Sequence, residues 1–96
     1  MLFALLCTDK PNSLELRQQS RPDHLMFLEG LGGSLKAAGP FTDDDGKPTG
    51  SLVIIDAKDR AEISGIAARD PYALAELFAS VEIKPWKWLI KNPEAQ

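Results

Sequence analysis

The sequence contains little of what marks secreted, membrane or metal-binding proteins. Its 96 residues include one cysteine and one histidine, which predicts neither an internal disulfide nor a Cys/His zinc cluster. The longest uninterrupted apolar runs, residues 2–7 and 52–55, are far shorter than the roughly 20 residues of a membrane-spanning helix. The first ten residues have no basic region and no cleavage site, so a secretory signal is not expected. We therefore predict a cytoplasmic protein that contacts no membrane.

No cofactor or metal site is indicated either. Cys7 lies inside the first apolar run, where we expect it to act as a small buried hydrophobe. Residues 43–46 read Asp-Asp-Asp-Gly, which faintly resembles a calcium-binding loop, but no glutamate follows at the required position. A solvated turn is the better interpretation. We expect the protein to work without a metal ion or an organic cofactor.

The charge balance is slightly acidic. Eleven Lys and Arg residues stand against 14 Asp and Glu, giving a formal net charge of −3. Proteins that bind the phosphate backbone usually present a basic face, so a nucleic-acid partner is not expected. With 44% apolar residues the chain is too hydrophobic to be disordered, and its length fits one domain. We expect a single domain over residues 1–96, with a loose tail from about residue 92.

The apolar pattern and the turn residues predict the order strand, helix, strand, strand, helix, strand. We expect strands at residues 2–8, 35–41, 50–56 and 81–90, a helix at 13–31, and a helix in two pieces over 59–78. Right-handed crossovers then place both helical segments on one face of a mainly antiparallel sheet. The predicted fold class is α+β, as a ferredoxin-like βαββαβ sandwich.

Two prolines predict local irregularities. Pro22 lies inside the first helical segment, where it removes a hydrogen bond, so we expect a kink or a restart near residues 20–21. In the last strand, the apolar residues change from odd to even positions around Pro85. Such a change of phase requires an inserted residue, so we expect a bulge or bend at Pro85.

The predicted sheet has more apolar surface than its helices can cover. The first and third strands are apolar on both sides, whereas both helical segments lie on one face. The other face needs a cover, and a second copy of the same sheet is the simplest one. We therefore predict a homodimer whose sheets pack face to face.

One stripe of the first helix combines cationic, titratable and apolar side chains. Spacing of three, four and seven residues aligns Arg17, Arg21, His24, Leu28 and Leu31. The stripe brings His24 to the edge of the core. A histidine there either satisfies a backbone carbonyl at the boundary of the core or transfers protons, since its side chain titrates near neutrality.

Asp70 also has two interpretations. It precedes Pro71, and a helix N-cap followed by proline explains it fully. If Asp70 approaches His24, its carboxylate would instead orient the imidazole, as the acid of a catalytic triad does. The spacing of the two residues in the sequence does not show such a contact.

Five segments together resemble, in order and spacing, the YciI-like (YCII-related) family. They are residues 21–24 (Arg-Pro-Asp-His), 38–40 (Ala-Gly-Pro), 50–51 (Gly-Ser), 70–72 (Asp-Pro-Tyr) and 81–86. The resemblance covers nearly the whole chain. It implies a dimeric ferredoxin-like α+β barrel, similar to muconolactone isomerases and antibiotic-biosynthesis monooxygenases. It also implies a site built on a His–Asp pair, here His24 and Asp70. Some relatives are lyases that eliminate halide from chlorinated aromatic diols.

Two hypotheses for function follow. In the first, the protein is an enzyme in which His24, oriented by Asp70, is the general acid or base for elimination or isomerisation of a small anionic or phenolic molecule. We expect four further residues to bind this substrate or line its cavity: Arg21, Arg17, Ser51 and Trp86. Ser51 also fits a purely structural role, and Trp86 fits the core or the dimer interface. In the second hypothesis, the protein is a non-catalytic ligand-binding or accessory dimer module.

Overall fold

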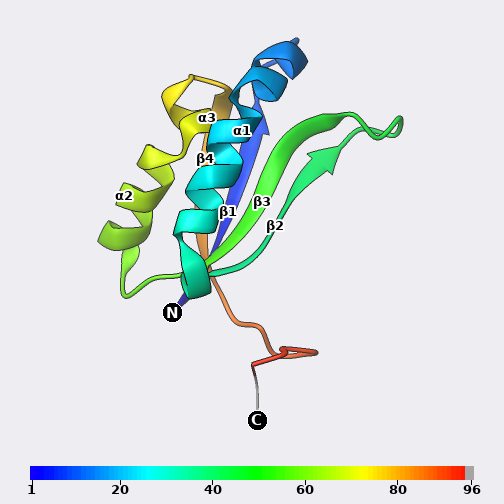
Figure 1. Ribbon diagram of the computed structural model, residues 1–96. Helices are drawn as coiled ribbons and strands as arrows, with labels where there is room; N and C mark the ends of the chain where they lie inside the picture. The colour runs from blue at the N-terminus through cyan, green and yellow to red at the C-terminus, as the bar shows by residue number, and fades with distance from the viewer. Residues whose placement is uncertain (95–96) are drawn as a thin grey trace.

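A four-stranded antiparallel sheet carries all the helices on one face (Figure 1). The computed structural model describes residues 1–94, and no helix within them is long and apolar enough to cross a membrane. The elements in chain order are β1 (Leu2–Asp9), α1 (Leu14–Gly30), a 3-10 turn (Gly32–Ser34), β2 (Leu35–Thr42), β3 (Pro48–Asp56), α2 (Arg60–Arg69), α3 (Pro71–Leu74) and β4 (Phe78–Trp86). The strand order β2-β3-β1-β4 confirms the predicted α+β sandwich.

The core lies between the sheet and the helices. Because side chains alternate along a strand, every second residue of β1 points to the helices, and these are Phe3, Leu5 and Cys7. They pack with the corresponding residues of β3 and with apolar residues of α1 and α2, namely Val53, Ile55, Leu28, Ile63 and Ile66. Cys7 is buried in this cluster, as expected for a small hydrophobe.

Helix α1 passes through Pro22 without interruption, so the predicted restart near residues 20–21 is wrong. Proline leaves the carbonyl of the residue four positions earlier, Gln18, without its helical donor. Both Pro22 and Gln18 are exposed, so water is available to that carbonyl. A proline on the outer side of a helix therefore does not end it.

The second helical segment is shorter than predicted. Helix α2 begins as expected after Asp59, whose carboxylate accepts a hydrogen bond of 2.9 Å from the Glu62 N–H. Helix α3, however, ends at Leu74 rather than near residue 78, because Glu76 adopts a left-handed backbone with φ of 60°. This turn directs Leu77, which is fully buried, into the core. Strand β4 then begins at Phe78.

The irregularity of β4 lies at its other end. Pro85 pairs in regular register with Phe3, so the predicted bulge at Pro85 is wrong. The register instead shifts between Thr8 and Asp9 of β1. Strand β4 is an edge strand, where a proline can direct its missing N–H away from the ladder. The strand ends at Trp86, so the apolar residues beyond it belong to no strand.

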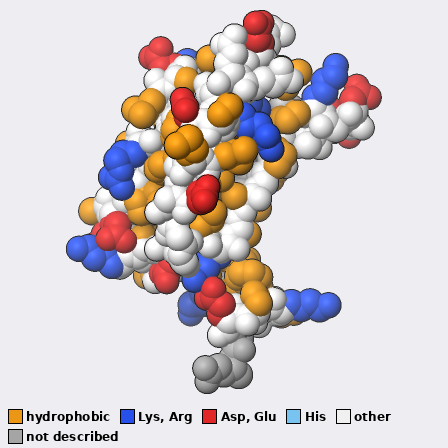
Figure 2. Space-filling model, viewed as in Figure 1, with side chains coloured by type: hydrophobic (Ala, Val, Ile, Leu, Met, Phe, Trp, Pro, Cys, Tyr) orange, Lys and Arg blue, Asp and Glu red, His pale blue; other side chains and the backbone are white. Residues whose placement is uncertain are grey.

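The face of the sheet turned away from the helices is apolar at its centre, and its β4 edge carries Trp86 together with the exposed ion pair of Glu82 and Lys84. Leu6 and Leu52 pair across β1 and β3 on this face, while Phe41 of β2 and Trp86 of β4 are about two-fifths exposed at opposite edges. The helical face carries hydrophobic side chains scattered among charged ones (Figure 2). Exposed apolar side chains therefore occur on both sides of the molecule, with Phe41 and Trp86 on the face without helices and Leu25 and Met26 on α1.

The chain after β4 returns toward the opposite edge of the sheet. An ion pair of 2.9 Å joins Glu94 to Lys36 of β2, and the Asn92 side chain donates to the Trp88 carbonyl. Strands β2 and β4 are the two edges of the sheet, so residues 87–94 cross between them. The last part of the predicted loose tail, residues 95–96, lies outside the described residues.

Candidate functional site

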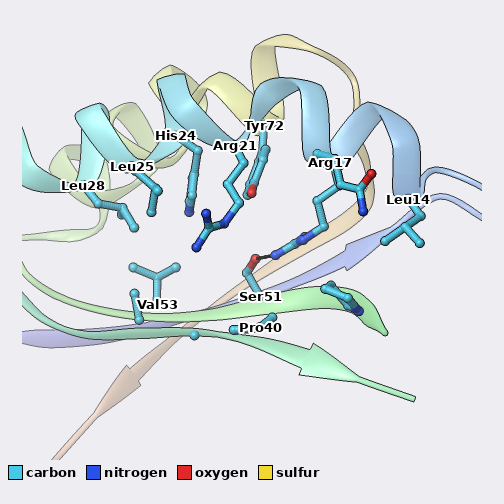
Figure 3. Close-up of a pocket in the computed structure, with 14 residues that line it drawn as sticks. Leu14, Arg17, Arg21, His24, Leu25, Leu28, Pro40, Ser51, Val53 and Tyr72 are labelled. Atoms are coloured by element: carbon cyan, nitrogen blue, oxygen red, sulfur yellow. Dashed lines mark hydrogen bonds between the residues drawn. The ribbon is translucent and has the colours of Figure 1, made fainter. Parts of the chain in front are cut away.

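A cavity of about 350 Å³ lies between α1 and the β2–β3 half of the sheet (Figure 3). Its helical wall carries most of the polar side chains, and its sheet wall is mainly apolar. The lining residues are Leu14, Arg17, Gln18, Arg21, His24, Leu25, Leu28, Ala38, Gly39, Pro40, Pro48, Ser51, Val53 and Tyr72. The predicted stripe of α1 thus faces this cavity along most of its length.

His24 and Asp70 are brought together by the start of α3. Asp70 caps α3, and its Oδ1 accepts from the Tyr72 N–H at 2.9 Å. The same oxygen lies 2.8 Å from His24 Nδ1, and both side chains are buried. The two interpretations of Asp70 are therefore compatible, because one carboxylate caps the helix and contacts the imidazole.

Tyr72 fixes the plane of the imidazole. The His24 and Tyr72 rings stack with centroids 3.9 Å apart and planes inclined by 15°. On its other side the tyrosine ring meets the guanidinium of Arg17, whose Cζ lies 4.7 Å from the ring centroid. Figure 3 shows the tyrosine between these two side chains, which project from α1 toward the sheet. Apart from the position of Tyr72 directly after Asp70 and Pro71, no pattern in the sequence indicates this stack.

Arg17 is buried and fully engaged. Its Nη1 donates to both oxygens of Asp9 at 3.0 Å, and its Nη2 donates to the Ser51 hydroxyl. Ser51 follows Gly50, where a side chain would collide with the Cys7 carbonyl of β1. The absence of a side chain at Gly50 lets β1 and β3 approach beside the serine. Arg17 is thus anchored in the cavity wall by residues of two strands.

Arg21 differs from Arg17 in having no fixed partner. It lines the cavity and is exposed, and within residues 1–94 the structure shows no hydrogen bond or ion pair of its side chain. Figure 3 shows its guanidinium extending toward the space below His24 and Tyr72. Arg21 therefore presents a positive charge to any molecule in the cavity.

Trp86 is not part of this cavity, which corrects its expected place in the lining. Trp86 pairs with Leu2, next to the pair of Phe3 and Pro85, which faces the helices. Because successive side chains of a strand point to opposite faces, the Trp86 side chain lies on the face without helices. The rings of Trp86 and Trp88 lie 5.6 Å apart. Trp86 and His24 therefore lie on opposite sides of the sheet.

Burial keeps the Cys7 thiol and the Tyr72 hydroxyl protonated. It raises the pKa of the Cys7 thiol to about 12, an effect to which the nearby Asp70 and Asp9 carboxylates add. Burial also raises the pKa of the Tyr72 hydroxyl, whereas the positive charges of Arg17 and then Arg21 oppose the rise. Both groups are neutral at physiological pH. Tyr72 is therefore a hydrogen-bond donor, and Cys7 is not a nucleophile.

The arrangement suits proton transfer. If the Asp70 carboxylate accepts the hydrogen of His24 Nδ1, the free lone pair of the imidazole is on Nε2. The His24 ring extends toward the sheet side of the cavity in Figure 3, beside Arg21. Within residues 1–94 no group of three or more His, Cys, Asp or Glu side chains could hold a metal ion. The paired His24 and Asp70 side chains can carry out acid–base catalysis or bind a ligand.

Comparison with known proteins identifies the family. The model of the YCII-related domain matches residues 1–87. The chain belongs to this family. Among curated relatives, protein YciI of Escherichia coli is 37% identical over 95 residues, covering 91% of this chain and 97% of its own length. The resemblance noted in the sequence is thus confirmed.

Solved structures extend the comparison to fold and chemistry. The 5-chloro-2-hydroxyhydroquinone dehydrochlorinase of Burkholderia phenoliruptrix AC1100, in complex with 2,5-dihydroxybenzoquinone, is 34% identical. It superposes with a TM-score of 0.84 over 91% of this chain and 94% of its own. An antibiotic biosynthesis monooxygenase, 14% identical, matches with a TM-score of 0.57 over 93% and 99% of the two chains, and shares the fold alone. The ferredoxin-like architecture of this YCII-related protein is therefore shared with enzymes of different chemistry.

Proposed function

We propose that this YCII-related protein is a cofactor-independent acid–base enzyme that acts on a small anionic or phenolic molecule by elimination or isomerisation. The observation that carries the proposal is the buried 2.8 Å contact between His24 Nδ1 and Asp70 Oδ1 in the wall of the cavity. Asp70 orients the imidazole through Nδ1, so His24 Nε2 is the atom that accepts the proton.

Each reaction is a proton transfer with a defined electron balance. In an elimination, His24 Nε2 takes a proton from the substrate, and the electrons of that bond form a new double bond. The leaving group departs with its own bonding pair. In an isomerisation, the imidazolium returns the proton to another atom of the same molecule. A positioned acid–base group contributes about 10²–10⁴-fold in rate, which suits substrates with an already acidic hydrogen.

The cavity supports a small, partly apolar substrate. Its volume of about 350 Å³ is at the lower end of ligand pockets. Leu25, Leu28 and Val53 supply apolar surface, and the unpaired guanidinium of Arg21 is the charge available to hold an anionic group. Arg17 and Ser51 bond to each other, so we assign them to shaping the wall and positioning Tyr72.

The dehydrochlorinase similarity supports elimination over isomerisation. That protein's name describes loss of hydrogen chloride from a chlorinated hydroxyhydroquinone, and its structure holds a dihydroxybenzoquinone. A substrate of this kind is planar, phenolic and small, which are the properties that the present cavity favours. We therefore propose hydroxylated aromatic compounds, halogenated ones included, as the first substrates to test.

We also propose that the protein is a cytoplasmic homodimer closed by the apolar face of the sheet. Leu6, Leu52, Phe41 and Trp86 give this face apolar side chains at its centre and both edges. A second copy supplies the same surface, so one two-fold axis would cover all four positions in both subunits. The buried thiol of Cys7 is compatible with a reducing compartment.

The test of function starts from binding and ends on turnover. Hydroquinones, hydroxyhydroquinones and their chlorinated forms are screened by thermal shift, since a ligand at 100 times its Kd adds about 2.7 kcal/mol of stability. Compounds that bind are then assayed for chloride release or for a change in absorbance. We expect the wild-type protein to turn over at least one of them.

The variant His24→Asn provides the decisive comparison. It retains a side chain that hydrogen-bonds to Asp70 but cannot serve as a base, so we expect turnover to fall at least 100-fold while binding persists. Met26→Ala is the matched control, because Met26 lies on the same helix and is 70% exposed. Full activity of His24→Asn would overturn the proposal. Tight binding without turnover in the wild type would favour the ligand-binding module.

A further inference from the structure

The Tyr72 hydroxyl has no role in the mechanism described so far. Tyr72 is 2% exposed and lines the cavity, yet within residues 1–94 the structure shows no hydrogen bond of its hydroxyl to another side chain or carbonyl. Among the described residues no fully buried side-chain nitrogen or oxygen lacks a hydrogen-bond partner, so the Tyr72 hydroxyl oxygen is accessible from the cavity and is free to donate to a molecule there. In Figure 3 its oxygen points from the helical layer into the cavity. A polar atom of a bound molecule is the natural partner.

We propose that the Tyr72 hydroxyl and the Arg21 guanidinium together form an oxyanion site, which binds the ionised oxygen of a planar phenolate or enolate beside His24. The inference rests on the proposed function and specifies the chemical class of its substrate. It names Tyr72 as a catalytic residue, since its hydroxyl touches the oxygen on which negative charge develops.

The stacking geometry places donor and base side by side. The Tyr72 and His24 rings are nearly parallel at 3.9 Å, and both extend toward the sheet. Their polar ends therefore address neighbouring atoms of one small molecule. His24 Nε2 removes the proton, and the electron pair left behind delocalises onto the oxygen held by Tyr72. No oxidant, reductant or co-reactant is needed for this step.

The charge of the site favours an anion at this point. Arg21 has no partner within residues 1–94, whereas the charge of the neighbouring Arg17 is balanced by Asp9 at 3.0 Å. Burial raises the pKa of the Tyr72 hydroxyl, and the positive charges of Arg17 and then Arg21 oppose this rise. The effect of Arg21 is consistent with an arginine close to a neutral hydroxyl. A neutral hydroxyl donates to an oxyanion, whereas a tyrosinate would repel it.

The probe for this site is 4-nitrophenol, whose phenolate absorbs at longer wavelength than the neutral phenol. We expect the wild-type protein to bind the phenolate in preference to the phenol, so that the bound probe ionises at lower pH than the free probe. Tyr72→Phe keeps the ring that stacks on His24 but removes the donor. We expect it to weaken phenolate binding about 10-fold or more, the effect of losing a hydrogen bond to a charged group.

Two variants of Arg21 test whether its positive charge is what binds the phenolate. Arg21→Gln is expected to lose the preference for phenolate, and Arg21→Lys to retain part of it because the positive charge remains. Met26→Ala, exposed on the same helix, is expected to bind as the wild type does. Circular dichroism and thermal melts confirm that each variant is folded.

The outcomes distinguish this inference from the proposed function. Equal phenolate binding by the wild type, Tyr72→Phe and Arg21→Gln would overturn the oxyanion site, as would failure of the wild type to bind 4-nitrophenol at millimolar concentration. The catalytic proposal would still stand if His24→Asn lost turnover. Conversely, loss of phenolate preference in Tyr72→Phe together with full turnover by His24→Asn would support the anion site and reject the histidine mechanism.

Discussion

Tyr72 connects the two halves of the site at the level of single residues. One face of its ring contacts His24, which bonds to Asp70, and the other face contacts Arg17, which bonds to Asp9. Residues of β1, α1 and the start of α3 are thereby fixed relative to one another. Such contacts limit the rotamers of a buried histidine, which is what a proton-transfer group requires.

The ionisation of Tyr72 can be measured directly, because it is the one tyrosine of the chain. We expect its pKa to lie above that of free tyrosine, since burial disfavours the tyrosinate. Arg21→Gln removes a positive charge that opposes this shift, so it should raise the pKa further. Ultraviolet absorbance of tyrosinate as a function of pH gives both values. A titration midpoint in the variant equal to or below that of the wild type would contradict the placement of Arg21.

The buried ion pair predicts a large effect on stability. Arg17→Met leaves the Asp9 carboxylate buried without its partner, because both side chains are less than a tenth exposed. Breaking such a pair costs about 3–5 kcal/mol. We expect the double variant Arg17→Met/Asp9→Asn to recover part of this loss, as measured by urea unfolding. A double variant no more stable than Arg17→Met would indicate that the arginine acts through Tyr72 and Ser51 instead.

Cys7 predicts how stability changes in alkali. The thiol of an unfolded chain ionises near pH 9.0, whereas burial in the folded protein raises the pKa to about 12. Between these values the unfolded state alone releases the proton, so the free energy of unfolding falls as pH rises above about 9. Cys7→Ala should lose less stability than the wild type between pH 8 and 10. Iodoacetamide should modify the wild-type thiol only after unfolding.

At the level of elements, the sequence was most informative where local chemistry decides the structure. The start of α2 at Asp59 and the turn between β2 and β3 follow from capping and turn residues. The end of α3 depends instead on burying Leu77, and a tertiary contact of this kind leaves no local pattern. The same holds for the position of the β4 irregularity, which pairing with β1 determines.

Pro22 gives a prediction for α1. Proline within a helix costs up to about 3 kcal/mol relative to alanine, because it removes a hydrogen bond and crowds the preceding turn. Pro22 is exposed and does not line the cavity beside His24, so Pro22→Ala should stabilise the protein by about 1–3 kcal/mol in urea unfolding. Phenolate binding should be retained if the helix keeps its path. Destabilisation by this variant would indicate that the proline sets the direction of α1.

At the level of the whole molecule, the site depends on contacts between distant segments. Asp70 follows His24 by 46 residues, and only the family resemblance paired them in advance. The stripe of α1 correctly indicated one wall of the cavity, because helical spacing is local. Trp86 was misplaced because the predicted bulge at Pro85 would have turned it to the helical face, whereas β4 continues in regular register to Trp86. The partner of Arg17 could not be predicted, since Asp9 becomes its neighbour only in the folded chain.

If the protein is a dimer, a charged substitution in the proposed interface should halve the mass of the particle in solution. Phe41 is 41% exposed on the apolar face, so Phe41→Glu should leave the subunit folded but place a charge in the interface. We expect the wild type to sediment at twice the 10.5 kDa subunit mass and the variant at that mass. Met26→Glu, on the helical face, should remain dimeric. A monomeric wild type would refute the dimer.

The cavity lies on the helical side of the sheet, whereas the proposed contact between subunits lies on the other side. All the polar groups assigned to the chemistry, His24, Asp70, Tyr72 and Arg21, come from one chain. Association is therefore not required to assemble a reaction centre. Saturation should occur at one ligand equivalent per polypeptide, with a hyperbolic rather than sigmoidal isotherm, and dissociated subunits should retain their affinity.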